Sequence, residues 1–295
     1  MCKLHVVCKA TDNMPTTNCK HYRVSSALLP MHAFPSVKAE RTSECLYGEM
    51  LRNIPASVER LATSTLPDTG RSNADELLAA SDSNWLEVTL ERDGYSGFVQ
   101  SHQLDLIHDY DDQKPTHRVC NSSTLIFDEP CIKSRVIQRI PFLAQLVCTT
   151  PYDKNFHALH SGGFIWRHHL SDINQIFTSS PLELARFHFL GTPYLWGGCS
   201  PRGVDCSGLI QALATAKGFT IPRDSGDQEN ALSGTIDFEL RQSQDVVYWP
   251  GHTGILVDRD NLLHATANSL SCVIESLDTV IARAGAISSV KRLFT

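Results

Sequence analysis

A short pattern occurs twice in the first half of this 295-residue chain, and it limits the folds open to that half more than any other feature. The pattern is Gly-Phe-aliphatic, followed by a His and a Leu at fixed spacing, and it starts at Gly97 and again at Gly163. An Arg-Val pair precedes each copy, at 23–24 and 118–119. Two copies are too few for a solenoid, so we predict two small β-barrels in tandem. Their clearest β-prone runs are residues 85–90 and 97–99, then 143–149 and 163–166.

The two copies differ in length, and the difference locates an insertion. The Arg-Val pair and the glycine are 74 residues apart in the first copy (97 − 23) but 45 apart in the second (163 − 118). The first copy therefore carries 29 additional residues (74 − 45). We place them within residues 52–84, which are rich in Ser, Thr, Asp and Asn, and predict a surface insertion. Residues 1–20 match no pattern that predicts a structure.

Composition and charge argue against several kinds of partner. Hydrophobic residues make up 42% of the chain, enough for a buried core, and the net charge is −6 with no basic stripe, so we expect no nucleic-acid partner. The N-terminus has no apolar run that resembles a signal peptide, and no run in the chain is long enough to span a bilayer. We therefore expect a soluble cytoplasmic protein with no membrane partner. The length favours two or three domains.

The pattern changes after residue 181. Two helices are predicted, at 182–189 and 207–217, and the second has apolar residues at the helical period before it ends at Gly218. Three strands are predicted to follow, at 246–249, 254–257 and 262–265, with a polar hairpin loop between the last two. The end of the chain is thus expected to be an α+β domain, in which one helix precedes an antiparallel sheet.

Cys206 is the cysteine that calls for a chemical explanation. The chain has ten cysteines but no Cys-x-x-Cys pair, so we predict neither a metal site nor a redox pair, and expect most of them to be free and buried. Cys206, however, stands directly before the helix predicted at 207–217. A helix N-terminus offers unpaired N–H groups and a positive dipole end, which favour a thiolate. Because small Ser207 and Gly208 indicate an accessible sulfur, we predict that Cys206 is a nucleophile.

Two histidines on the predicted hairpin supply a base. A cysteine nucleophile needs a base within hydrogen-bond reach. His252 starts one strand of the hairpin, and His264 lies on its partner, 12 residues later (264 − 252). Residues near the ends of two paired strands can face each other. We therefore predict that His252 accepts the thiol proton while His264 fixes the orientation and tautomer of its ring.

Several segments together resemble the NlpC/p60 peptidases, in that family's order and spacing. They are Gly-Thr-Pro-Tyr-Leu-Trp-Gly-Gly at 191–198, Asp-Cys-Ser-Gly-Leu-Ile-Gln at 205–211, Pro-Arg-Asp-Ser at 222–225, Gly-His-Thr-Gly-Ile at 251–255 and His-Ala at 264–265. The resemblance covers about residues 176–295. It implies an α+β fold in which a papain-like catalytic domain follows two small SH3-like β-barrels. The domains would be 21–112, 115–173 and 176–295.

The tandem arrangement resembles one branch of that family, the bacterial γ-D-glutamyl-L-diamino-acid endopeptidases, or dipeptidyl-peptidase VI. This resemblance implies a cysteine endopeptidase that needs no cofactor and cuts murein stem peptides of the form L-Ala-γ-D-Glu-diamino acid. It implies the roles of nucleophile for Cys206, base for His252, orienting residue for His264 and oxyanion or pocket residue for Tyr194. Substrate binding falls to Asp205, Ser207, Arg223, Asp224 and Ser225, joined by Tyr95 and Glu49 from the first SH3-like unit.

Elementary electrostatics favours such a pocket independently. A free ammonium group that leaves water needs hydrogen-bond acceptors and negative charge, which Asp224, Tyr95 and Glu49 would provide. A closed wall at the end of the pocket that binds the ammonium group would admit two substrate residues and exclude longer N-terminal extensions. The enzyme would then act on released peptides, which indicates peptide recycling.

Three other interpretations stay open. Asp-Thr-Gly at 68–70 and Asp-Ser-Gly at 224–226 match the tripeptides of aspartic peptidases, although neither follows an apolar strand. The chain could also be a catalytically silent murein-peptide binding protein, since SH3 units often bind ligands. The third possibility is a wall-lytic hydrolase or amidase that acts on intact peptidoglycan.

Overall fold

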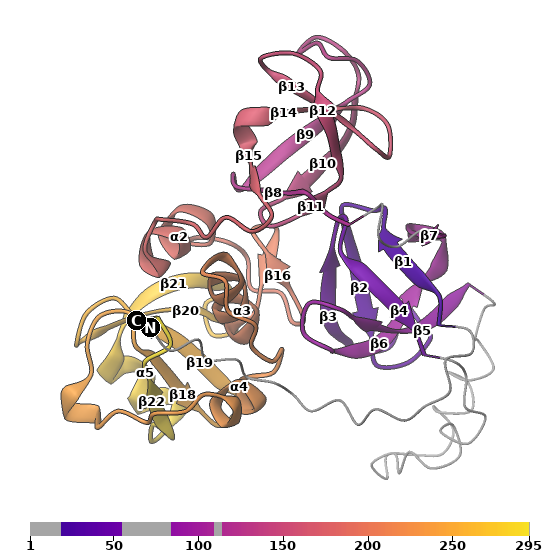
Figure 1. The fold of residues 1–295 in the computed structure, drawn as a ribbon. Coiled ribbons are helices and arrows are strands. Elements are labelled where there is room, and N and C mark those ends of the chain that lie inside the picture. Colours follow the sequence, from indigo (N-terminus) through magenta and orange to yellow (C-terminus); the bar gives the residue numbers. More distant parts are fainter. Residues whose placement is uncertain (1–18, 55–83, 109–113, 295) are drawn as a thin grey trace.

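The computed structural model describes residues 19–54, 84–108 and 114–294. Figure 1 shows three parts in chain order, which are two β-rich units and a third part in which helices pack on a sheet. Most of the insertion predicted at 52–84, and nearly all of the segment 1–20, lie outside the described residues.

The first unit is one antiparallel sheet with a buried apolar face. Buried aliphatic residues such as Val24, Leu51 and Val99 form its core. The outermost strands of the sheet do not pair with each other, so the described residues form no closed barrel here. In sheet order its strands are β3 (Arg41–Leu46), β2 (Leu28–His32), β6 (Ser96–Gln100), β5 (Trp85–Leu90), β4 (Met50–Asn53), β1 (His21–Val24) and β7 (Leu104–Ile107).

The second unit consists of two smaller sheets, and neither closes into a barrel within the described residues. The single strand predicted at 143–149 is wrong. Leu143 has a φ of 67°, which makes a turn before β11. One sheet has the order β10 (Val136–Pro141), β9 (Ser123–Phe127), β14 (Phe164–Trp166), β13 (Phe156–Leu159) and β12 (Cys148–Pro151); the other has β11 (Gln145–Leu146), β8 (His117–Val119) and β15 (Leu170–Asp172).

The repeated sequence pattern forms the same structure in both units. Each copy is a strand, a 3-10 turn and a second strand, with the turns being η2 (Ser101–Gln103) and η4 (Arg167–His169). The upstream valine pairs with the leucine of the pattern in each unit, Val24 with Leu104 and Val119 with Leu170. The repeat is therefore structural as well as sequential.

The third part has a five-stranded antiparallel sheet with helices beside it. The predicted strands are confirmed. Helix α4, which comes before the sheet, and helix α5, which comes between two of its strands, were not predicted. Strands run in the order β21 (Ser271–Ser276), β20 (Asn261–Thr266), β19 (His252–Leu256), β18 (Val246–Trp249) and β22 (Ser289–Lys291). The remaining elements are α2 (Pro181–His188), β16 (Cys199–Ser200), β17 (Gly203–Val204), α3 (Cys206–Ala216), α4 (Ser225–Ala231), η5 (Phe238–Leu240) and α5 (Leu277–Ala284).

Helix α3 is the centre of this part. Asp205 caps its N-terminus, and nearly all of its residues are buried, because the sheet strands β19 and β20 cover one side while α2 and β16 cover others. An apolar helix buried on all sides is a core helix. Among the described residues, no helix is both long and apolar enough to cross a membrane.

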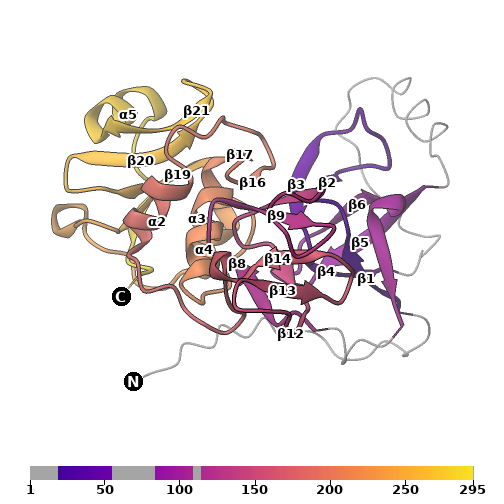
Figure 2. The ribbon, with the colours of Figure 1, turned by 90° about the horizontal axis from the view of Figure 1, so that it is seen from above.

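Both β-rich units contact the third part, as Figure 2 shows from above. From the first unit, the Glu44 carbonyl accepts from the Cys199 thiol (3.2 Å), and Asp93 accepts from the Gln211 side chain (2.8 Å). From the second unit, Arg118 donates to the Thr215 carbonyl at the end of α3 (3.3 Å). Residues of the first unit can therefore take part in a site at the start of α3.

Candidate active site

Cys206 is the first residue of α3, and Asp205 holds that helix start in place. The Asp205 carboxylate accepts the Gly208 N–H through Oδ1 (2.7 Å) and the Gly197 N–H through Oδ2 (2.8 Å). Cys206 itself is only 7% exposed. The backbone N–H groups of Thr253 and Ser207 donate to its sulfur, so the start of strand β19 lies against the thiol.

Two histidines and a glutamate form a line across three neighbouring strands. His252 Nε2 and His264 Nδ1 are 2.7 Å apart, and His264 Nε2 lies 2.8 Å from Glu275 Oε2. Strands β19 and β20 pair Ile255 with Leu263. The same register puts His264 opposite Gly254. The two histidines therefore meet diagonally, not directly across the ladder. His252 directly precedes Thr253, so it lies on the strand whose backbone borders the thiol.

Burial acts against the charged forms of both the thiol and the imidazole. It raises the pKa of Cys206 to about 11, and the neighbouring Asp205 carboxylate acts in the same direction. Burial also lowers the pKa of His252 to about 4, with the His264 ring contributing. The helix start was predicted to favour a thiolate, and burial opposes that effect.

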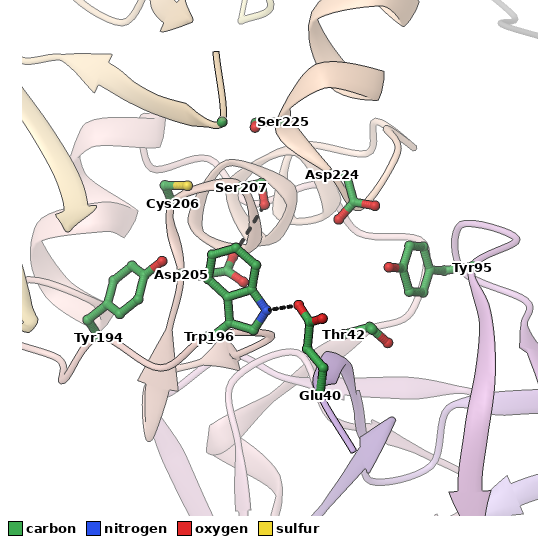
Figure 3. A pocket seen from close by; sticks show the side chains of 11 residues that line it. Glu40, Thr42, Tyr95, Tyr194, Trp196, Asp205, Cys206, Ser207, Asp224 and Ser225 are labelled. Atoms are coloured by element: carbon green, nitrogen blue, oxygen red, sulfur yellow. Dashed lines mark hydrogen bonds between the residues drawn. The ribbon is translucent and has the colours of Figure 1, made fainter. Parts of the chain in front are cut away.

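A pocket of about 310 Å³ opens over the thiol, within the size range of small-ligand sites. Figure 3 shows that Cys206 and Tyr194 lie at one side of it, and Asp224, Tyr95 and Thr42 at the other. Its walls come from both the first unit and the third part: Glu40, Thr42, Tyr95, Tyr194, Trp196, Asp205, Cys206, Ser207, Asp224, Ser225 and Gly251.

The side of the pocket away from the thiol is acidic. The Tyr95 hydroxyl donates to the Asp224 carboxylate and accepts from Thr42. Glu40 accepts from the Trp196 indole N–H at 2.9 Å, which fixes a second carboxylate at the rim (Figure 3). Burial raises the pKa of Asp224, while the adjacent Arg223 guanidinium opposes that rise. The pocket thus offers a nucleophile at one end and two carboxylates toward the other.

The comparison with protein families decides what kind of domain this is. Residues 191–287, which contain Cys206, His252 and His264, match the NlpC/P60 family model. This region is an NlpC/P60 domain.

Three curated relatives match parts of this chain. A gamma-D-glutamyl-L-lysine dipeptidyl-peptidase of Bacillus subtilis is 36% identical over 101 residues, which are 32% of this chain and 34% of the relative. Dipeptidyl-peptidase 6 of Lysinibacillus sphaericus is 33% identical over 90 residues, or 30% of this chain and 33% of the relative. A gamma-D-glutamyl-L-lysine dipeptidyl-peptidase of Bacillus cereus is 25% identical over 223 residues, 66% of each chain. The matches thus span about a third of two relatives and 66% of another.

The similarity of fold extends beyond the NlpC/P60 domain. A crystal structure of an NlpC/P60 family protein from Bacillus cereus superimposes with a TM-score of 0.74 at 17% identity, covering 93% of this chain and 100% of that one. An NlpC/P60 endopeptidase from Photobacterium damselae gives a TM-score of 0.55 at 14% identity, covering 95% of this chain and 75% of that one. The β-rich units and the NlpC/P60 domain therefore share one overall fold with the Bacillus cereus protein.

Glu49 corrects one expectation about the site. It was expected to bind the substrate amine, but it is 2% exposed and lies outside the pocket. Its carboxylate accepts from Arg92 Nη1 (2.7 Å) and from the Leu46 N–H (2.8 Å), so it is a buried ion-pair partner. Glu40, which was not predicted, lines the pocket instead. Sequence reasoning missed it because the pocket-facing end of β3 cannot be recognised without the contact to Trp196.

Arg223 also has a different place from the one expected. It does not line the pocket, and it is 2% exposed. Its guanidinium donates to both Asp205 oxygens (Nη1–Oδ1 3.0 Å, Nη2–Oδ2 2.6 Å), to Ser207 Oγ (2.9 Å) and to Ser43 Oγ of the first unit (3.2 Å). Arg223 therefore positions the helix start behind the pocket. The other expected residues, Tyr95, Tyr194, Asp205, Ser207, Asp224 and Ser225, do line it.

Proposed function

We propose that this chain is a cysteine peptidase that cleaves the bond between γ-D-glutamate and a diamino acid in murein peptides with a free N-terminal L-alanine. The observation that carries the proposal is the two-ended pocket, with Cys206 at one end and the Asp224 and Glu40 carboxylates toward the other. The names of the Bacillus subtilis and Bacillus cereus relatives support the same bond. A substrate with a free amine is a released peptide, so the role is peptide recycling, and the expected cytoplasmic location stays a prediction.

The acidic end recognises the substrate amine. An ammonium group carries three N–H donors and one positive charge, and it loses its hydration on entering the pocket. Asp224 and Glu40 provide charge, and the Tyr95 hydroxyl keeps the Asp224 carboxylate in place. A longer N-terminal extension or a neutral, acylated amine would leave these carboxylates without a partner, at a cost in binding.

The reaction proceeds through an acyl-enzyme. The Cys206 sulfur bonds to the γ-carbonyl carbon of D-glutamate as its proton passes to His252. The oxyanion forms near the Cys206 N–H and the Tyr194 hydroxyl, whose pKa is raised by burial and by the nearby thiol, so it stays a donor. His252 then protonates the departing amine of the diamino acid. It next takes a proton from water, which hydrolyses the thioester and releases L-Ala-γ-D-Glu.

We also propose the three-domain division at 21–112, 115–173 and 176–295, with the first two as SH3-like domains. Each of the two domains contains the same strand, 3-10 turn and strand, which supports a common origin of the two domains. The first domain supplies Glu40, Thr42 and Tyr95, so it completes the substrate site. The second domain contacts the end of α3 through Arg118 and supports the helix from behind.

Incubation with L-Ala-γ-D-Glu-meso-diaminopimelate tests the function. Wild type should release L-Ala-γ-D-Glu, Cys206→Ala should not, and Cys131→Ala, which removes an exposed free cysteine, should match wild type. Equal activity of Cys206→Ala would refute the mechanism. Binding without turnover in the wild type would favour the silent binding protein.

N-acetylation of the alanine separates the remaining candidates. A recycling peptidase that reads a free amine should lose most of its activity on the acetylated peptide. Undiminished cleavage, or release of peptides from intact peptidoglycan, would favour a wall-lytic hydrolase. Inhibition by a thiol alkylator with no effect of pepstatin would exclude an aspartic peptidase.

A further inference from the structure

The line of side chains behind the thiol does not end at His264. On β20 and β21, His264 is paired with Val273, so Glu275 is its diagonal neighbour on the same face. The Glu275 Oε2 atom lies 2.8 Å from His264 Nε2. Arg283, in the last turn of α5, donates to both oxygens of Glu275, at 2.7 and 3.2 Å. Four side chains from three adjacent strands and one helix are thus connected in sequence.

The donors and acceptors along this line allow one arrangement of protons. A carboxylate only accepts, so His264 must carry its proton on Nε2. A neutral His264 then has a bare Nδ1, which accepts the Nε2 proton of His252. A neutral His252 with its proton on Nε2 has a bare Nδ1. That nitrogen is the one left to take the proton of the Cys206 thiol.

We propose that Glu275, held by Arg283, is a positioning residue that sets the tautomers of both histidines and so makes His252 Nδ1 the base. This inference rests on the proposed cysteine peptidase function. It goes beyond the three residues Cys206, His252 and His264, because it assigns the donor and the acceptor of every hydrogen bond between the carboxylate and the sulfur.

The state of Glu275 fits this role. Its hydrogen bonds from Arg283 and from His264 lower its pKa to about 2, so it is a carboxylate across the working range. Its negative charge also opposes the effect of burial on His252, whose imidazolium forms during attack. A wrong tautomer at the equivalent position of a serine protease costs about 10⁴-fold in rate, which shows how much such an arrangement can control.

The substitution Glu275→Leu removes the acceptor at the end of the line. Arg283 Nη2 and His264 Nε2 both reach the same Oε2 atom of Glu275, at 2.7 and 2.8 Å. Without that oxygen nothing holds the His264 proton on Nε2, so neither ring keeps a fixed tautomer. We expect kcat to fall by at least about tenfold with little change in KM, because no pocket contact is lost. Glu239→Leu, at an exposed glutamate, is the matched control.

The conservative variant Glu275→Gln gives the decisive comparison. Its amide oxygen can take the place of Oε2 and accept from both Arg283 and His264 Nε2, so the tautomers are kept although the charge is lost. We expect Glu275→Gln to keep more of the wild-type kcat than Glu275→Leu. A purely structural role for the ion pair predicts two equally slow variants, because both lose the charge. Thermal unfolding of each variant identifies any loss that is due to misfolding.

Nitrogen-15 NMR of the histidine rings in the substrate-free protein reads the tautomers directly and needs no activity. Wild type and Glu275→Gln should show protonated Nε2 on both rings, and Glu275→Leu should lose this preference. Unchanged tautomers in Glu275→Leu, or a Glu275→Gln variant as slow as Glu275→Leu, would overturn the inference. If the wild type cleaves no murein peptide, the proposed function fails, while the ring spectra still decide the role of Glu275.

Discussion

The Trp196 indole N–H donates to Glu40 Oε1 at 2.9 Å, and this bond joins the NlpC/P60 domain to the first β-rich unit at the mouth of the pocket. Trp196 is 58% exposed and lines the pocket, where its indole fixes the Glu40 carboxylate. The substrate site is therefore shared between two parts of the chain.

Glu40→Gln should weaken substrate binding, whereas Glu49→Gln should weaken the fold. Loss of a charged contact to the ammonium group is expected to raise KM about tenfold or more with little change in kcat. Glu49→Gln removes the charge that pairs with buried Arg92, so it should lower the free energy of unfolding and leave KM unchanged. Steady-state kinetics and urea unfolding of both variants check this. If KM rose in Glu49→Gln and not in Glu40→Gln, Glu49 would be the residue that binds the substrate amine, as the sequence predicted.

Arg223→Met should destabilise the NlpC/P60 domain strongly. The substitution leaves the Asp205 carboxylate buried without its partner, which costs about 3–5 kcal/mol for a buried ion pair. Arg135→Met is the control, because its pairing with Asp128 is largely exposed and is worth about 1 kcal/mol at most. Urea unfolding measures both. Equal, small losses would show that the cap of α3 does not depend on Arg223.

Gly254→Ala should displace His264. A Cβ at residue 254 would lie 2.9 Å from the His264 Cβ and 2.9 Å from side-chain atoms of Leu262, so the hairpin must shift. We expect a stability loss of about 1–3 kcal/mol from overpacking, with a larger effect on kcat than on KM. Gly226→Ala is the control, because a Cβ there has no neighbour within 4 Å. A fully active Gly254→Ala enzyme would contradict the diagonal histidine contact.

The acid side of the pH–activity profile should lie unusually low. His252 is active when neutral, and burial lowers its pKa to about 4 from an ordinary 6.5. Values of kcat/KM should therefore hold through pH 6.5 and fall at lower pH, as His252 and the Asp224 carboxylate, whose pKa burial raises, take up protons. On the alkaline side, activity should decline above a pH of about 8 as the substrate ammonium group loses its proton. A half-point near 6.5 that does not belong to the substrate would show that His252 is not desolvated in solution.

Much of the local structure follows from the sequence. The apolar period of 207–217 predicts α3, and alternating β-prone runs predict β5 and β18 with the bounds observed. The Arg-Val pairs and the repeated glycine pattern predict two related units, because the same short-range pairing forms in each. Helix α4 is short and polar, so its formation depends on packing that no local pattern records. Helix α5 was missed although Ser276 caps it and Leu277 and Val280 form its buried face.

The sequence by itself determined the chemistry at the helix start, since Asp205, Cys206 and the small residues after them are adjacent in the chain. It also placed both histidines on one hairpin, because a short loop fixes which strands pair. Only the tertiary structure decided that Glu40 lies in the pocket while Glu49 pairs with Arg92, that Glu275 continues the histidine line, and that burial raises the pKa of the Cys206 thiol. These features depend on burial and on contacts between distant segments, and burial is a property of the assembled chain.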